Sequence, residues 1–169
     1  MNNVILVRLA RLFLVLVVQI FLFNNLYLWG YATPLFMGYM ITCFHRGTSR
    51  IILLLWGFTT GIVYDIFSNT AGIGAASCTL LAMLQPHLLA AFAPRDVADD
   101  FTPSMRMMGT WRFISYLLVS FFILHFSFYL LDAFMLSDIL LTLLATFAGT
   151  IATTAVVFFS DMLVRGNKR

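Results

Sequence analysis

Asp65 is the most conspicuous reactive side chain of this 169-residue chain, because it lies inside an otherwise apolar run. The other acidic residues lie in polar gaps or near the ends of such runs, and no glutamate is present. An ionisable group among lipid-facing residues costs free energy, so it usually has a function. Two interpretations stay open: a functional carboxylate, or a polar cap that binds the following turn or a neighbouring helix.

The remaining groups capable of catalysis or metal binding are scattered. His45 belongs to a basic loop and His125 stands alone in an apolar run, so neither has a second ligand at metal-binding spacing. Cys43 and Cys78 form no CxxC pair, which favours free buried thiols. The chain also lacks a phosphate-binding glycine loop and a recognisable serine, histidine and acid set. We therefore expect a noncatalytic protein with no metal or cofactor.

A proline with two polar neighbours interrupts one apolar run, as Gln85-Pro86-His87. Proline removes one backbone hydrogen bond and usually kinks a helix. The flanking side chains can then satisfy freed backbone groups or line a polar pocket. We favour a kinked packing helix, and a substrate pocket is the alternative.

Small residues form two stripes at helical spacing. Gly57 and Gly61 form a GxxxG pattern, which lets two helix backbones approach closely in a membrane. Its partner is either another helix of this chain or a helix of another protein. A second stripe of Ala145, Gly149 and Thr153 is a candidate for the intramolecular partner.

The composition predicts an integral membrane protein, since 62% of the residues are hydrophobic and only 10% are charged. The basic residues occupy alternate gaps between the apolar runs, at positions 8 and 11, 46 and 50, 95 to 112, and 165 to 169. By the positive-inside rule, this pattern predicts six spans with both termini in the cytoplasm. It also explains the net charge of +3 without nucleic-acid binding.

We therefore expect one all-α domain over residues 1–169, a compact bundle of six helices in a bacterial inner membrane. The predicted spans are 4–23, 26–44, 51–67, 73–93, 113–131 and 139–159. The second is the weakest, because Gly30 and Pro34 leave too short an apolar stretch, and it could be re-entrant. The charge alternation favours a full crossing. The Asp-rich stretch 94–110 is either a contact for a cytoplasmic partner or a solvated connection.

Residues 57–74 resemble the signature region of the rod shape-determining protein MreD family. That pattern is a glycine-rich helix ending in aspartate, then a short polar turn and a glycine-containing start to the next helix. Ile62 and Val63 stand where the family often has leucine, and 70–72 lacks a frequent proline. The matching positions, which are also our candidates for helix packing or partner contact, are Gly57, Gly61, Asp65, Gly72 and Gly74.

The resemblance implies a noncatalytic scaffold of the bacterial cell-elongation machinery. Members of that family bind the bitopic protein MreC and link MreB filaments to RodA and its partner transpeptidase. The family is thought to share the six-helix fold of the substrate-binding subunits of energy-coupling-factor transporters.

That shared fold leaves a vitamin-binding transporter subunit as the main alternative. Such a protein would have an outward cavity, to which Trp29, Tyr31, Asp65 and Asp132 could contribute. A lipid-linked enzyme or flippase is a third class. It would need cations deep inside the spans to hold a phosphate, and none is placed there, since Arg8 and Arg11 can reach the inner interface from the start of the first span.

Overall fold

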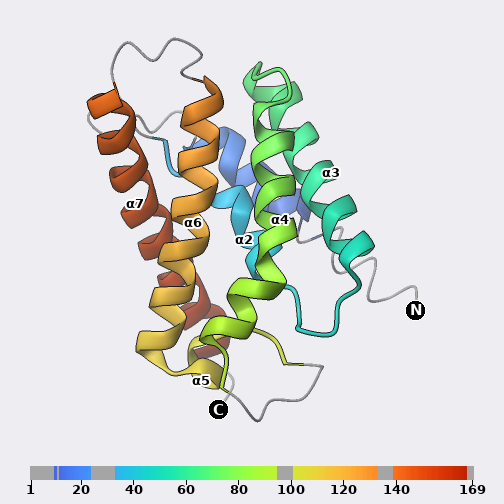
Figure 1. Cartoon of the computed structure of the whole chain (residues 1–169), viewed down its shortest axis with the longest axis vertical. Helices are drawn as coiled ribbons and strands as arrows, with labels where there is room; N and C mark the ends of the chain where they lie inside the picture. The colour runs from blue at the N-terminus through green and yellow to red at the C-terminus, as the bar shows by residue number, and fades with distance from the viewer. Residues whose placement is uncertain (1–9, 11, 24–32, 95–100, 133–138, 167–169) are drawn as a thin grey trace.

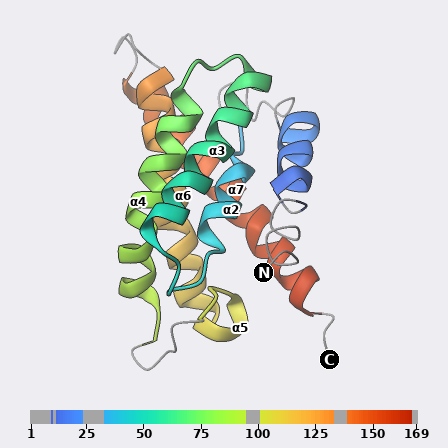
Figure 2. The same ribbon diagram turned by 90° about the vertical axis from the view of Figure 1, so that its right-hand side faces the viewer.

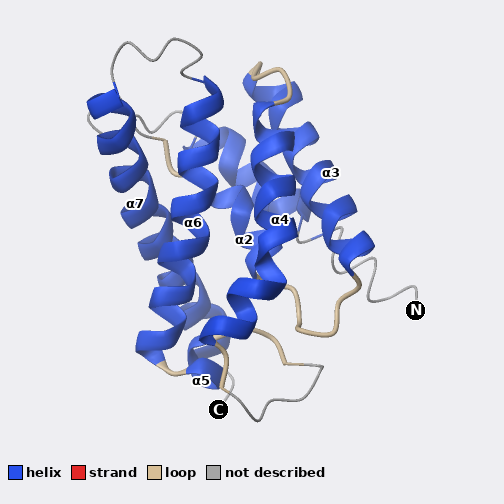
Figure 3. Cartoon of the chain, viewed as in Figure 1, coloured by secondary structure: helices blue, strands red, loops and turns tan. Residues whose placement is uncertain are grey.

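The computed structural model describes residues 10, 12–23, 33–94, 101–132 and 139–166, and all regular structure among them is helical (Figures 1 and 3). Four helices are long and apolar enough to cross a membrane: α3 (Arg50–Ser68), α4 (Ile73–Phe92), α6 (Thr110–Asp132) and α7 (Ile139–Gly166). They correspond to the third to sixth predicted spans. A shorter apolar helix, Leu12–Phe21, lies within the first predicted span and passes into a π-helical turn, η1 (Gln19–Phe23).

Two antiparallel helix pairs form the bundle (Figure 1). α3 packs along α4, and α6 packs along α7, while contact between α4 and α6 joins the pairs. Short connections between apolar helices favour this arrangement, because each helix must bury one face against its neighbour in sequence. α7 continues well beyond the predicted end at residue 159, so Asp161 lies inside a helix and not after it.

The second predicted span, 26–44, is wrong as a single helix. Residues 24–32 lie outside the described part, and 33–35 are not helical. The helical residues that follow are a 3₁₀ turn, η2 (Phe36–Gly38), and one α-helical turn, α2 (Tyr39–Thr42). These two turns rise only about 10–14 Å, less than half of the hydrocarbon core. We call residues 33–44 the buried segment.

The buried segment lies in the middle of the molecule. Figure 2 shows the helix of residues 12–23 on the opposite side of α2 from α4. Leu35, Met37 and Ile41 have no exposed surface. Irregular backbone is tolerated at membrane depth only where protein surrounds it, so this burial permits the broken helix.

The two ends of the bundle differ in charge. α3 and α6 begin, and α4 and α7 end, at one end of the bundle (Figure 1). Arg46 and Arg50 lie there, together with Arg112 in the first turn of α6 and the short helix α5 (Met105–Met108). We call this the arginine end. The opposite end carries the turn from α3 to α4, and we call it the turn end.

Candidate functional site: a capped helical hairpin

Asp65 binds the first turn of α4 from the last turns of α3. Its Oδ1 accepts hydrogen bonds from the Gly74 amide at 2.8 Å and the Thr70 hydroxyl at 2.6 Å. Its Oδ2 accepts a hydrogen bond from the Ala75 amide at 2.9 Å. These amides are among the four at a helix start that have no partner within the helix. The carboxylate therefore acts as an N-cap supplied by the preceding helix, and the polar-cap interpretation describes it.

A cap from outside is needed because Gly72, the N-cap residue of α4, has no side chain. The carboxylate also lies at the positive end of the α4 dipole, which favours a negative charge. Only 8% of Asp65 is exposed, so few of its hydrogen bonds are with surrounding solvent or headgroups. Its charge is balanced by donors of the hairpin itself.

The turn itself depends on two residues with positive φ. Asn69 closes α3 at φ 55°, and its amide donates a hydrogen bond to the Asp65 carbonyl. Gly72 follows at φ 85°. Asparagine and glycine are the residues that adopt this left-handed region most readily. The reversal between α3 and α4 therefore favours asparagine or glycine at both positions.

Gly57 and Gly61 allow α3 to touch α4. A Cβ atom at Gly57 would lie 2.7 Å from the Ala82 Cβ and 2.8 Å from the Cys78 carbonyl oxygen. A Cβ atom at Gly61 would overlap the backbone at the start of α4, at Gly74 and Ala75. Backbone cannot move aside as a flexible side chain can, so hydrogen is the only substituent that fits at Gly61.

Gly74 has the same role for the cap. A Cβ atom there would lie 2.6 Å from Asp65 Oδ1 and 2.9 Å from the Tyr64 ring. All five positions of the signature pattern thus belong to one unit, which we call the capped hairpin (Arg50–Phe92). Gly57 and Gly61 permit close packing, and Asp65 binds the start of α4. Gly72 forms the turn, and Gly74 leaves room for the carboxylate.

The small-residue stripe on α7 does not pair with this glycine pattern, so that expectation was wrong. Gly149 faces α6 instead, where an added Cβ would lie 2.5 Å from the His125 ring. The short turn holds α4 against α3, and α4 takes the position that the stripe was expected to fill.

A shallow hollow lies beside the cap. It has a volume of about 400 Å³ and is lined by Ile62, Asp65, Ile66, Ala71 and Gly72. Ile66 is 71% exposed there. We call it the turn-end hollow. It places an apolar surface next to the hydrogen-bonded cap of the hairpin.

Polar side chains of the surrounding helices bind the start of the buried segment. The Leu35 amide donates to Thr153 Oγ1 at 3.1 Å and to His125 Nε2 at 3.3 Å. His125 Nδ1 lies 2.8 Å from the Phe121 carbonyl oxygen, to which it donates, so Nε2 is the acceptor. Gln19 donates to the Pro34 carbonyl at 3.0 Å and accepts from the Met37 amide at 3.2 Å.

The end of the buried segment is bound in the same way. The Tyr116 hydroxyl donates to the Thr42 carbonyl at 3.0 Å, and Gln85 Nε2 donates to the Phe44 carbonyl at 3.2 Å. Gln85 is therefore a tether between elements, whereas His87, two residues further on, is exposed. The sequence did not reveal these tethers, because their partners are 41 and 74 residues away.

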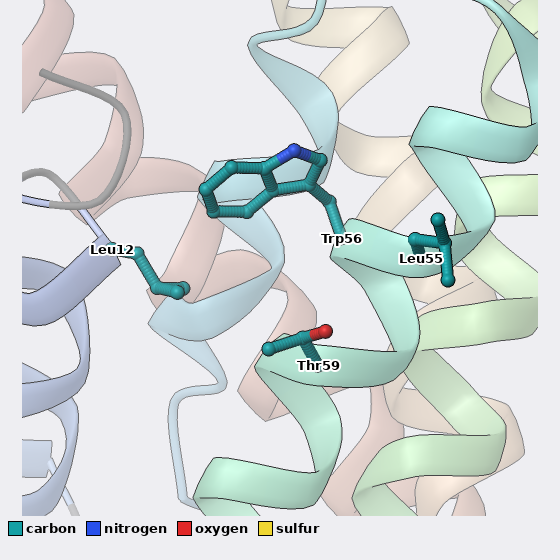
Figure 4. Close-up of a pocket in the computed structure, with 4 residues that line it drawn as sticks. All are labelled: Leu12, Leu55, Trp56 and Thr59. Atoms are coloured by element: carbon teal, nitrogen blue, oxygen red, sulfur yellow. The ribbon is translucent and has the colours of Figure 1, made fainter. Parts of the chain in front are cut away.

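A small apolar groove separates the helix of residues 12–23 from α3. It has a volume of about 170 Å³ and is lined by Leu12, Leu55, Trp56 and Thr59. The Trp56 indole extends across it toward Leu12 (Figure 4). The same indole packs against Phe44, with ring centroids 6.2 Å apart, and so closes the buried segment from this side.

Asp161 is a functional candidate that the sequence analysis missed. Its side chain is only 3% exposed, and Oδ2 accepts a hydrogen bond from the Met105 amide at 3.1 Å. The apolar residues at 162–164 were the available signal, because they continue the helix past the predicted end at 159. The described residues contain no group of three His, Cys, Asp or Glu side chains placed to hold a metal ion.

The vitamin-site candidates do not come together in the described residues. Asp65 is bound within the hairpin, and Asp132 is exposed at the end of α6. Trp29 and Tyr31 lie outside the described residues. No family model, curated protein or solved structure matches this chain.

Proposed function

We propose that this chain is a noncatalytic scaffold of the bacterial cell-elongation machinery, similar to MreD, in the inner membrane. In this role it binds MreC and helps couple MreB filaments to RodA and its partner transpeptidase. The observation that carries the proposal is the capped hairpin. The five positions that resemble the MreD signature are the same five whose atoms bring α3, the turn and α4 together.

A rigid hairpin suits a scaffold because a binding surface that is ordered in advance loses little entropy on association. The turn-end hollow lies on this hairpin, with Ile62 and Ile66 on one helical face. A membrane-crossing helix of MreC could pack there through van der Waals contact, the main source of attraction between helices in lipid. We therefore assign MreC to the turn-end hollow.

The orientation is part of the same proposal. The arginine end faces the cytoplasm by the positive-inside rule. α7 ends at the arginine end, consistent with a cytoplasmic C-terminus. The turn end and its hollow then face outward.

The vitamin-transporter alternative has less support from the described residues. The buried segment fills the centre of the bundle. Its backbone is hydrogen-bonded to the polar side chains of Gln19, Gln85, Tyr116 and His125. Such side chains would be needed to bind a polar ligand. In this chain they hold the protein's own backbone.

Co-purification tests the proposal with matched variants. Ile66→Trp adds bulk at the turn-end hollow, and Ile151→Trp adds the same bulk on α7, at residues that are 71% and 62% exposed. We expect MreC to co-purify with the wild type and with Ile151→Trp from membranes in mild detergent. With Ile66→Trp, the amount of MreC recovered should fall at least fivefold. Equal recovery with both variants would exclude the hollow as the interface. Recovery of cytoplasmic ATPases with a membrane coupling subunit, and not MreC, would instead identify a transporter subunit.

A further inference from the structure

A second and larger hollow lies at the arginine end, between the last turn of α4 and the first turn of α6. Its volume is about 690 Å³, and it is lined by Ala90, Ala91, Phe92, Ala93, Pro94 and Arg112. We call it the Arg112 hollow. The small alanine side chains leave the space, and the arginine supplies a positive charge at its edge.

The walls of the Arg112 hollow offer both donors and acceptors of hydrogen bonds. Arg112 presents a planar group of donors that stays charged at any physiological pH. On the α4 side, the carbonyl groups of the last turn lack partners within the helix. The Leu89 carbonyl accepts a hydrogen bond from the Ala93 amide. The next carbonyl, that of Ala90, has no such partner at position 94, because Pro94 has no amide hydrogen. The hollow therefore offers cationic donors on one wall and carbonyl acceptors on the other.

The position of the hollow suits the headgroup level of a membrane. The neighbouring Trp111 is 82% exposed, and tryptophan is enriched at the membrane interface. Toward the membrane centre, the exposed surface of α4 carries Leu80 and Met83, which suit acyl chains. A lipid could thus place its headgroup in the hollow and its chains along α4.

His87 adds an independent indication. It is exposed on α4, three and four residues before Ala90 and Ala91, so it lies on the same helical face as the hollow. Ionisable side chains within membrane spans rarely face lipid tails. A phosphate at the edge of the hollow would give this imidazole a polar neighbour.

We propose that the Arg112 hollow binds an anionic glycerophospholipid. Arg112 binds the phosphate, and hydroxyl groups of the headgroup donate to the α4 carbonyls. Basic pockets between membrane helices are known to hold such headgroups. The site is remote from the turn-end hollow, and the inference stands independently of the proposed function.

Thermal unfolding of the purified full-length chain in neutral detergent tests the proposal, with phosphatidylglycerol as the anionic probe and phosphatidylcholine as the zwitterionic one. At about a hundredfold excess over the dissociation constant, we expect phosphatidylglycerol to raise the unfolding midpoint by about 5–10 °C. Phosphatidylcholine should have little effect. Arg112→Gln should lose most of the shift, whereas Arg50→Gln, at the same end of the bundle, should keep it.

A second variant separates the hollow from the charge. Ala91→Phe keeps the guanidinium but fills the space, so it should also lose the shift. The proposal is overturned if Arg112→Gln keeps the full shift, or if Arg50→Gln loses as much, which would indicate diffuse surface attraction. It is also overturned if glycerol phosphate alone reproduces the effect, since the ligand would then be a soluble phosphate.

Discussion

Two buried aspartates at opposite ends of the bundle bind backbone amides in different ways. At the turn end, both oxygens of Asp65 bind amides that lie nine and ten residues further along the chain. At the arginine end, Asp161 binds the Met105 amide, 56 residues away. The first contact closes a local hairpin between two long helices. The second joins the last helix to a four-residue helix across the bundle.

The difference in sequence separation between the two contacts indicates which part of the fold can form by itself. A contact over ten residues requires little loop closure, so the capped hairpin can form early and stay rigid. The contact of Asp161 requires α5 and α7 to be in place first. We therefore expect the turn end to be the more stable of the two ends, and the following substitutions test that order.

Gly61→Leu should have the largest effect. Its side chain would overlap the backbone of α4, which cannot move without separating the two helices. We expect a loss of about 3 kcal/mol or more of unfolding free energy, at or above the upper end for overpacked sites. Unfolding in mixed micelles measures it. Ala76→Leu, at an exposed position on α4, is the control and should be close to wild type.

Asp65→Asn should cost more than Asp161→Asn. The amide cannot accept at both positions that face the Gly74 and Ala75 amides, so a buried donor loses its partner. We expect a loss of about 2 kcal/mol for Asp65→Asn, within the roughly 1.5–3 kcal/mol that a hydrogen bond to a charged group contributes. Asp161→Asn should lose only about 1 kcal/mol, because its side-chain oxygen can still accept from the Met105 amide. Hydrogen exchange should quicken at Gly74 in the first variant and at Met105 in the second. Equal losses would contradict the comparison between the two ends.

Gly72→Ala should have the smallest effect. A Cβ atom at Gly72 meets no neighbour, so the only cost is its left-handed backbone, about 1 kcal/mol. Asn69→Gly removes a milder strain at the other left-handed position and should leave stability unchanged or slightly raised. Thermal unfolding of the two single variants measures both. A Gly72→Ala protein as stable as the wild type would show that the turn tolerates a different conformation.

Much of the helical framework was predictable because hydrophobic runs of spanning length have few alternatives in a membrane. The starts of α3, α4, α6 and α7 lie within three residues of the predicted ones. The end of α7 was missed, because an aspartate after an apolar run is normally a sign that the span has ended. The burial of Asp161 depends on its contact with α5, which hydropathy does not reveal.

The candidate site was only partly predictable. The spacing of Gly57, Gly61 and Asp65 placed them on one face of a helix, and the short turn placed α4 beside it. That spacing did not determine which helix packs against Gly57, since the stripe on α7 also consists of small residues. The buried segment was predicted as a weak span, because hydropathy cannot distinguish lipid from protein as the apolar surroundings.

The amino-acid sequence by itself determined that this chain is helical and has helices long and apolar enough to cross a membrane, where the four such helices of the described residues begin, and that α3 and α4 form a tight hairpin. These features follow from local hydrophobicity and from a turn of a few residues. Only the tertiary structure decided that residues 33–44 form a broken, buried segment, that Gln85 and His125 hold it, and that Asp161 is enclosed. These depend on contacts between residues far apart in the chain, and such contacts form only when the helices have packed.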